Sequence, residues 1–227
     1  MVNPESNVPP ESETYWAELA GMDPDDVCKR AICTYDSDAG EYHLCVLNED
    51  YTLNPKTRTM CRVSEPLSHH ECEPGARLLF VSLYYLTHAK EVLISEEWTT
   101  GERLEAGAFF FRGPHALPTE RVEEEWGTDL NKFCARANFL GGKKIKIAAD
   151  ATYRFEMLPR IPVLLGLWVG DDEFPPRAQF LFDPSIVKHF TLDVVLYTCN
   201  YLIERMIFIG GDPAAHAHDH DREHDHD

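Results

Sequence analysis

Residues 163–182, VLLGLWVGDDEFPPRAQFLF, decide the fold that this sequence predicts. Two β-prone runs, Val163–Val169 and Arg177–Phe182, flank a connection rich in Gly, Asp and Pro. Such turn-forming residues between two short β-prone runs are typical of neighbouring antiparallel strands. We therefore expect an antiparallel hairpin whose connection carries the three acids Asp171–Glu173.

Further strands are predicted on the N-terminal side of this hairpin. Ala31–Tyr35 and Glu41–Leu47 are β-prone and are joined by the five-residue loop DSDAG, which indicates a second hairpin. The remaining predicted strands are Tyr51–Val63 (one or two strands, broken at Asn54-Pro55), Ala108–Arg112, Lys143–Ala149 and Thr152–Met157. Most of these segments lie next to each other in sequence and are linked by short turns.

Helical periodicity separates these strands. Helices are predicted over Thr14–Ala20, from Pro24 onward, over Gly75–Lys90, over Pro118–Leu140 in two pieces that meet near Gly127, and over Leu192–Ile209. Regular alternation of strand and helix is absent, so the sequence predicts the α+β class. We expect a mainly antiparallel sheet of hairpins with helices packed on one face, in a single domain.

Composition divides the chain into three parts. With 227 residues and 44% hydrophobic content, it is long enough to bury one substantial core. Residues 1–13 are polar and contain three prolines, and we expect a disordered lead there. Residues 14–211 are the predicted α+β domain. Beyond them, residues 212–227 contain no apolar side chain larger than Ala or Pro, which predicts a disordered tail.

The chain is strongly acidic, with a formal net charge of −18. Without residues 216–227 it still has 34 acids against 20 bases. This charge repels nucleic-acid phosphates and anionic lipid headgroups, so we expect neither nucleic acid nor membrane as a partner. A basic protein or a metalloenzyme is the expected partner. The first 20 residues lack a secretory signal, which favours a cytoplasmic location.

Seven cysteines are present, and none are paired in a C-x-x-C motif. An odd number without such spacing favours reduced thiols in a cytosol. Cys33 and Cys45 fall in predicted strands and Cys199 in a predicted helix. Free cysteines in such places behave as small core residues, which is our interpretation of these three.

The C-terminal segment predicts metal binding. Five histidines alternate with acids there: His216, His218, His220, His224 and His226. Imidazole is a ligand for nickel, zinc and cobalt, and a flexible run of such ligands binds without preformed geometry. We therefore expect a divalent transition metal on the tail. The alternative is a solvated acidic tail with incidental histidines.

Two further groups could bind metal or act in catalysis. His69-His70-Glu71-Cys72 has ligand types, but adjacent loop residues rarely chelate one ion together. Asp172 and Glu173, with Asp150 and Asp183 expected nearby, could hold a hard cation or supply an acid/base pair. Ordinary turn chemistry is the alternative for these acids. Three arginines could neutralise them or bind an anionic ligand: Arg154, Arg160 and Arg177.

Phosphate-binding and hydrolase motifs are missing. The sequence has no G-x-x-x-x-G-K-[ST], G-x-G-x-x-G, G-x-S-x-G or H-E-x-x-H. Accordingly, we expect no nucleotide cofactor, and no motif requires an enzyme.

Several short motifs, most of them in the second half of the chain, resemble the domain of unknown function 3786 family. They are Glu97-Trp98-Thr99, Gly141-Gly142, Asp150, Leu158–Pro162, Trp168–Pro175 and Phe182-Asp183. The resemblance implies an origin in anaerobic bacteria or archaea and a link to corrinoid or one-carbon enzymes, with no reaction attached. Some members resemble fusions to an N-terminal iron–sulfur segment. Only Cys28 precedes Cys33 here, so we expect no iron–sulfur cluster.

Two functions follow from these observations. The first is a non-enzymatic accessory or binding module of anaerobic metabolism with a metal-binding tail. The second is an enzyme that uses Asp172, Glu173 and Asp183 as catalytic carboxylates. A cleft lined by these acids favours the enzyme, whereas a solvated acidic turn favours the module.

Overall fold

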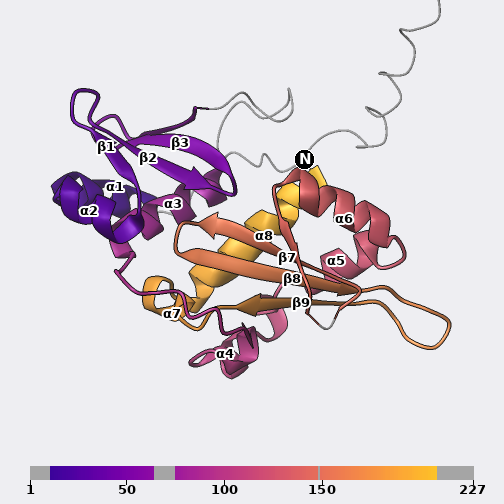
Figure 1. Cartoon of the computed structure of the whole chain (residues 1–227). Helices are drawn as coiled ribbons and strands as arrows, with labels where there is room; N and C mark the ends of the chain where they lie inside the picture. Colours follow the sequence, from indigo (N-terminus) through magenta and orange to yellow (C-terminus); the bar gives the residue numbers. More distant parts are fainter. Residues whose placement is uncertain (1–10, 64–74, 148, 209–227) are drawn as a thin grey trace, which may run out of the picture.

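A computed structural model describes residues 11–63, 75–147 and 149–208. Within them the strands form two antiparallel sheets (Figure 1). The first sheet has the order β1-β2-β3-β4 and the second the order β5-β9-β8-β7-β6. With helices before, between and after the strands, this arrangement confirms the predicted α+β class. The predicted strands divide between two sheets.

The second sheet contains the predicted hairpin. Its strands are β5 (Thr99–Thr100), β6 (Lys143–Ile145), β7 (Ala151–Leu158), β8 (Ile161–Trp168) and β9 (Arg177–Phe182). Strands β8 and β9 pair antiparallel, from Val163 opposite Phe182 to Trp168 opposite Arg177. Strand β8 is buried along nearly its whole length, which explains its almost uninterrupted apolar sequence.

The first sheet is a meander of short strands. They are β1 (Thr34–Asp36), β2 (Glu41–Val46), β3 (Glu49–Asn54) and β4 (Thr59–Arg62). The β1–β2 hairpin and the break after Asn54 are as predicted, but Ala31 ends a helix and the first strand starts only at Thr34. Leu47 and Asn48 both have left-handed backbones, as the tight β2–β3 turn requires.

The predicted helices occur in the predicted order, and the short helices α4 and α7 are additional to them. The helices are α1 (Glu11–Gly21), α2 (Pro24–Ala31), α3 (Ala76–His88), α4 (Gly107–Phe110), α5 (Thr119–Trp126), α6 (Leu130–Phe139), α7 (Ile186–His189) and α8 (Leu192–Phe208). Helix α1 begins three residues before Thr14. Among the described residues, no helix is long and apolar enough to cross a membrane.

One predicted strand was wrong. Residues 108–112, an apolar run, form the short helix α4 and its end instead of a strand. Ala106 has a left-handed backbone, and a Cβ on Gly107 would lie 1.9 Å from the carbonyl oxygen of Gly101. The close approach of Gly107 to Gly101 accompanies a helical turn at this point of the chain. Secondary-structure propensity, which is a property of single residues, does not predict it.

Helix α8 is the central helix of the core. It runs behind β7 and β8 (Figure 1). Its buried side chains include Val194, Val195, Leu202, Ile203 and Met206. The polar residues of this helix lie along one side, where Asp193 is exposed and Asn200 and Glu204 are partly exposed. A helix that is apolar nearly all round is buried on most sides, as the sequence predicts.

The β2–β3 hairpin joins the first sheet to the rest of the molecule. Its tip donates a hydrogen bond from Leu47 N to the carbonyl of Met157 on β7, at 3.2 Å. Asn48 Nδ2 donates to the carbonyl of Leu140 at the end of α6, at 3.0 Å. Buried residues of both sheets belong to one continuous hydrophobic core. The two sheets are therefore held together by polar contacts as well as by packing.

Polar contacts hold the segment between α3 and β5 against the body. Arg160 Nε donates to the carbonyl of Arg30, and its Nη1 donates to that of Val92, at 2.7 and 3.0 Å. The backbone N–H of Lys90 donates to Nδ1 of His189, at 3.2 Å. His189 is 2% exposed. Burial, followed by the positive charges of Arg160 and Lys90, lowers the pKa of His189 to about 4, although Asp183 partly opposes them.

We expect His189 to make stability pH-dependent. The unfolded chain protonates this imidazole near pH 6.5, whereas the folded protein does so only near pH 4. The stabilisation is complete above the unfolded value and is lost as the pH falls toward 4. At about pH 4.5, the loss should reach about 2 to 3 kcal/mol relative to neutral pH.

Urea unfolding of the wild type and of His189→Asn at both pH values measures this. The Asn side chain can still accept from Lys90 N, but it does not titrate. The wild type should lose more stability on acidification than the variant. Equal pH dependence of the two proteins would contradict the assignment.

Candidate functional site

The predicted metal ligands of the tail lie outside the described residues. This applies to His216, His218, His220, His224 and His226, and also to the group His69-His70-Glu71-Cys72. Their metal binding stays a prediction from the sequence.

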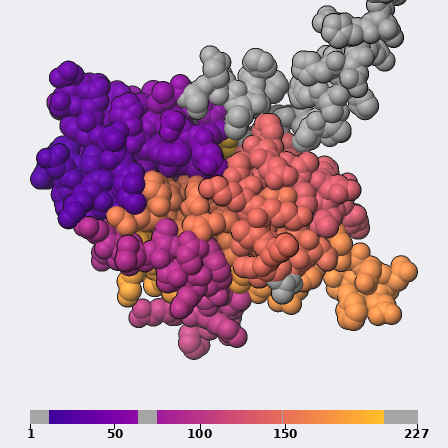
Figure 2. Space-filling view, in the orientation of Figure 1, coloured from indigo at the N-terminus to yellow at the C-terminus, as the bar shows by residue number. Residues whose placement is uncertain are grey.

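The acids Asp171, Asp172 and Glu173 lie on an exposed turn between β8 and β9. Figure 2 shows this connection as an orange protrusion at the lower right of the molecule. Asp171 Oδ1 accepts hydrogen bonds from the backbone N–H groups of Glu173 and Phe174, both at 2.8 Å. These two bonds lower the pKa of Asp171. Asp171 therefore stabilises the turn, which fits the interpretation as turn chemistry.

Asp183 lies at the opposite end of β9 from that turn. Strand β9 has six residues, so at about 3.3 Å per residue it separates the two groups by about 20 Å. The expected proximity of Asp183 to Asp172 and Glu173 is therefore wrong. Asp150 does lie at the turn end of the sheet, where its Oδ2 accepts from Val169 N at 2.9 Å.

Asp183 is 1% exposed and fully engaged in hydrogen bonds. Its Oδ1 accepts from Ser185 N at 2.9 Å, and its Oδ2 accepts from Ser95 Oγ and Glu96 N at 2.9 and 2.8 Å. Burial opposes ionisation, but these hydrogen bonds outweigh it and lower the pKa of Asp183. A carboxylate whose two oxygens already accept these hydrogen bonds holds the loop in place and is a poor general base.

The three arginines also make contacts elsewhere. Arg154 pairs with Glu96 at 2.6 Å and with Glu156 at 2.7 Å. Arg160 binds backbone carbonyls, as described above, and Arg177 stacks over the ring of Trp168 at 5.2 Å. In the part of the chain that the structure describes, these guanidinium groups contact Glu96, Glu156, backbone carbonyls and the Trp168 ring rather than the acids of the exposed turn.

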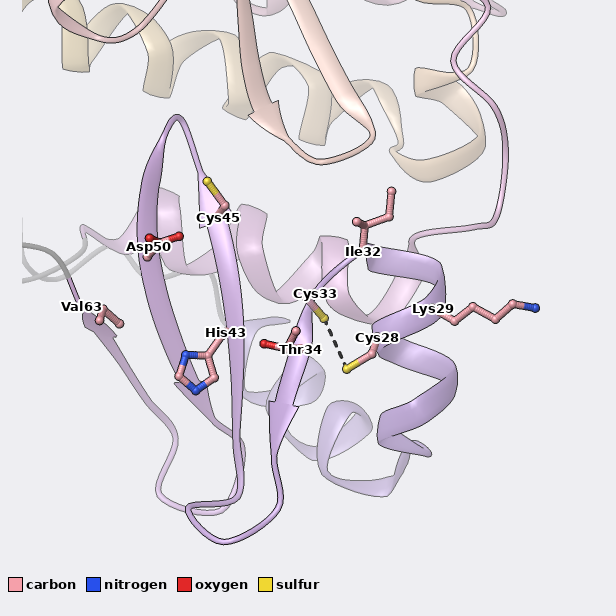
Figure 3. Close-up of a pocket in the computed structure, with 9 residues that line it drawn as sticks. All are labelled: Cys28, Lys29, Ile32, Cys33, Thr34, His43, Cys45, Asp50 and Val63. Atoms are coloured by element: carbon pink, nitrogen blue, oxygen red, sulfur yellow. Dashed lines mark hydrogen bonds between the residues drawn. The ribbon is translucent and has the colours of Figure 1, made fainter.

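A pocket on the first sheet was not predicted. It has a volume of about 540 Å³ and is lined by residues of α2, β1, β2 and β3 and the loop ends beside them (Figure 3). Its lining is Cys28, Lys29, Ile32, Cys33, Thr34, His43, Cys45, Asp50 and Val63. Three thiols, an imidazole and a carboxylate thus face one pocket.

Strand alternation explains how these groups reach the surface. In β2, Tyr42, Leu44 and Val46 are buried, so His43 and Cys45 point to the opposite, solvent-facing side. The interpretation of Cys45 as a core residue is therefore wrong. Cys33 is half-buried, whereas Cys199 in α8 is buried as expected. The period-2 pattern of Glu41–Val46 was the signal that could have placed Cys45 outside.

Cys28 and Cys33 are in contact. The end of α2 brings them together: Cys33 N donates to the carbonyl of Cys28 at 3.2 Å, and Ile32 between them has a left-handed backbone with φ 51°. The two Sγ atoms lie 3.8 Å apart. Burial raises the pKa of both thiols, so without a metal they are protonated at neutral pH and are poor nucleophiles.

In the described part of the chain, the pocket does not bring three side chains together in a metal-binding arrangement. Across residues 11–63, 75–147 and 149–208, no three His, Cys, Asp or Glu side chains are arranged to hold a metal ion. The described cysteines are free thiols: Cys28, Cys33, Cys45, Cys61, Cys134 and Cys199.

Comparison with known proteins gives a match to a protein family. No curated protein and no solved structure matches the chain. Residues 23–205 match the family model described as Domain of unknown function (DUF3786). This range runs from the cap of α2 to the last turns of α8 and includes both sheets. The chain therefore belongs to the domain of unknown function 3786 family.

Proposed function

We propose that this chain is a non-enzymatic accessory module that gathers a divalent transition metal on its C-terminal segment. The observation that carries the proposal is the alternation of five histidines with five acids over residues 216–227. Neutral imidazoles bind nickel, zinc or cobalt, and the carboxylates raise the local cation concentration. The acidic body, at −14 without this segment, adds to that attraction.

The contacts of the acids support a module over an enzyme. The catalytic alternative needs Asp172, Glu173 and Asp183 to converge on one substrate. Asp183 is buried and holds the loop at Ser95, whereas Asp172 and Glu173 are exposed beyond the other end of β9. Acids that are this far apart cannot share a proton-transfer step.

The proposed function also implies a cellular location and a partner. We infer a cytoplasmic protein of an anaerobe whose partner is a metalloenzyme or a basic protein. A polar ligand run without preformed geometry binds with moderate affinity and poor selectivity, which suits storage and delivery of a metal. Nickel, zinc and cobalt are the candidates, with no nucleotide and no iron–sulfur cluster.

Nickel binding should depend on neutral imidazole. Calorimetric titration of the intact protein with Ni²⁺ at about pH 7.5 and about pH 5.5 tests this. Affinity should fall by more than about tenfold at the lower pH, because imidazoles protonate near pH 6.5. A variant with all five tail histidines changed to Asn keeps the acids and should bind little nickel at either pH. Unchanged nickel binding in this variant would refute the proposal.

A further inference from the structure

The pocket on the first sheet contains a pair of thiols whose spacing fits a metal ion. Two thiolates bound to one tetrahedral metal at about 2.3 Å lie about 3.8 Å from each other. The Sγ atoms of Cys28 and Cys33 are 3.8 Å apart. A metal ion could therefore bridge them with little movement of either side chain.

The backbone fixes this spacing. Cys28 belongs to the last turns of α2, and the hydrogen bond from Cys33 N to its carbonyl closes the helix end. Ile32, the residue between helix and strand, adopts a left-handed conformation that is unfavourable for a β-branched side chain. Because both cysteines are attached to this closed turn, the two thiols are preorganised.

The surroundings of Cys28 and Cys33 differ from those of Cys199, a cysteine of the core. Cys199 is completely enclosed in the core, whereas Cys28 and Cys33 are half-buried and line an open pocket. Figure 3 shows both thiols between α2 and the start of β1, with Cys45, His43 and Asp50 on the neighbouring strands. An ion at the pair would keep open coordination positions facing the pocket, where water or a ligand from a partner can enter.

We propose that Cys28 and Cys33 form a dithiol site for a thiophilic metal ion such as Zn²⁺, Cd²⁺ or Cu⁺. Soft thiolate ligands select these ions over hard cations. Binding must release the thiol protons, because the thiolate is the ligand. With only two protein ligands, the site is open and is suited to metal exchange rather than to structural support. It does not depend on the proposed function of the C-terminal histidines.

Cadmium titration of the reduced full-length chain tests the site. Bound thiolates give an ultraviolet thiolate-to-cadmium charge-transfer band, which imidazole and carboxylate ligands do not produce. The wild type should develop this band with Cd²⁺ alone. Cys28→Ser and Cys33→Ser should each weaken the apparent affinity by more than about tenfold, since even loss of a second-shell partner costs a metal site 10- to 100-fold.

Matched variants separate this site from other ligands. Cys61→Ser removes an exposed cysteine of β4 that does not line the pocket, and it should leave the band unchanged. The five-histidine variant should also keep the band, even if it loses nickel binding. Circular dichroism and urea unfolding of the two Ser variants check that they are folded.

Three results would overturn the assignment. They are absence of the band in the reduced wild type, its persistence in the Cys28→Ser/Cys33→Ser double variant, and its loss in the five-histidine variant. Failure of the tail proposal would appear separately, as unchanged nickel binding in the five-histidine variant with the cadmium band intact.

Discussion

Replacing Glu49 with Ala should destabilise the folded protein by about 3 to 5 kcal/mol, the usual result of leaving a buried charge without its partner. Glu49 is 5% exposed at the start of β3. Its Oε1 accepts from Arg205 Nη2 of α8 at 2.7 Å, and its carboxylate also pairs with Arg62 of β4. Tyr51 donates its hydroxyl to Oε2 at 2.7 Å.

The size of this loss of stability follows from the position of Glu49 between the first sheet and α8. Glu49 joins the first sheet to α8, so its loss weakens the contact between the first sheet and the core and removes the anion that Arg62 and Arg205 share. Domains of this size are typically stable by only about 5–15 kcal/mol. The variant should therefore unfold at a much lower urea concentration than the wild type.

Glu125→Ala is the matched control. Glu125 pairs with Lys132 at 3.2 Å, but both side chains are largely solvated, at 39% and 47% exposure. Exposed ion pairs contribute only about 0–1 kcal/mol. Urea unfolding of both variants should show a large loss for Glu49→Ala and almost none for Glu125→Ala. Similar small losses in the two proteins would contradict the structural role of Glu49.

Local patterns in the sequence were enough to predict the hairpins and the long helices. Gly-Asp-Asp and Pro-Pro between two apolar runs predict β8 and β9 because turn chemistry is local. Asp23 and Pro24 likewise mark the start of α2, where Asp23 caps Asp25 N at 3.2 Å. The apolar circumference of Leu192–Phe208 predicts burial for the same reason.

Contacts between distant residues could not be predicted in this way. The Glu49–Arg205 pair joins residues 156 positions apart, and the approach of Gly107 to Gly101 depends on tertiary packing. Asp183 looked like a partner of the acidic turn because the two are near in sequence. An extended strand between them places them at opposite ends of the sheet.

Part of the thiol pocket could have been predicted from local sequence patterns, and part of it depends on contacts between distant residues. Alternation in β2 could have placed His43 and Cys45 on one solvent-facing side. Their proximity to Cys28 depends on how α2 ends and how β1 pairs with β2, which one sequence does not reveal. The tail histidines, in contrast, need no fold to be recognised as metal ligands.

Deletion of residues 216–227 should remove most of the nickel bound per chain and leave the fold nearly unchanged. Every tail histidine lies in this segment, which offers no apolar side chain larger than Ala to the core. The segment should therefore contribute little to folding. The unfolding temperature should shift by less than about 2 °C, which corresponds to under about 1 kcal/mol in a chain of this size.

The most direct test is calorimetric titration of Ni²⁺ into the intact and the shortened protein at about pH 7.5, where imidazoles are neutral. We predict that the shortened protein is folded and binds only a small fraction of the nickel bound by the intact chain. If the shortened protein kept the full stoichiometry, the central claim of a C-terminal metal-gathering segment would be wrong. His69, His70 and Cys72 would then be the next candidates.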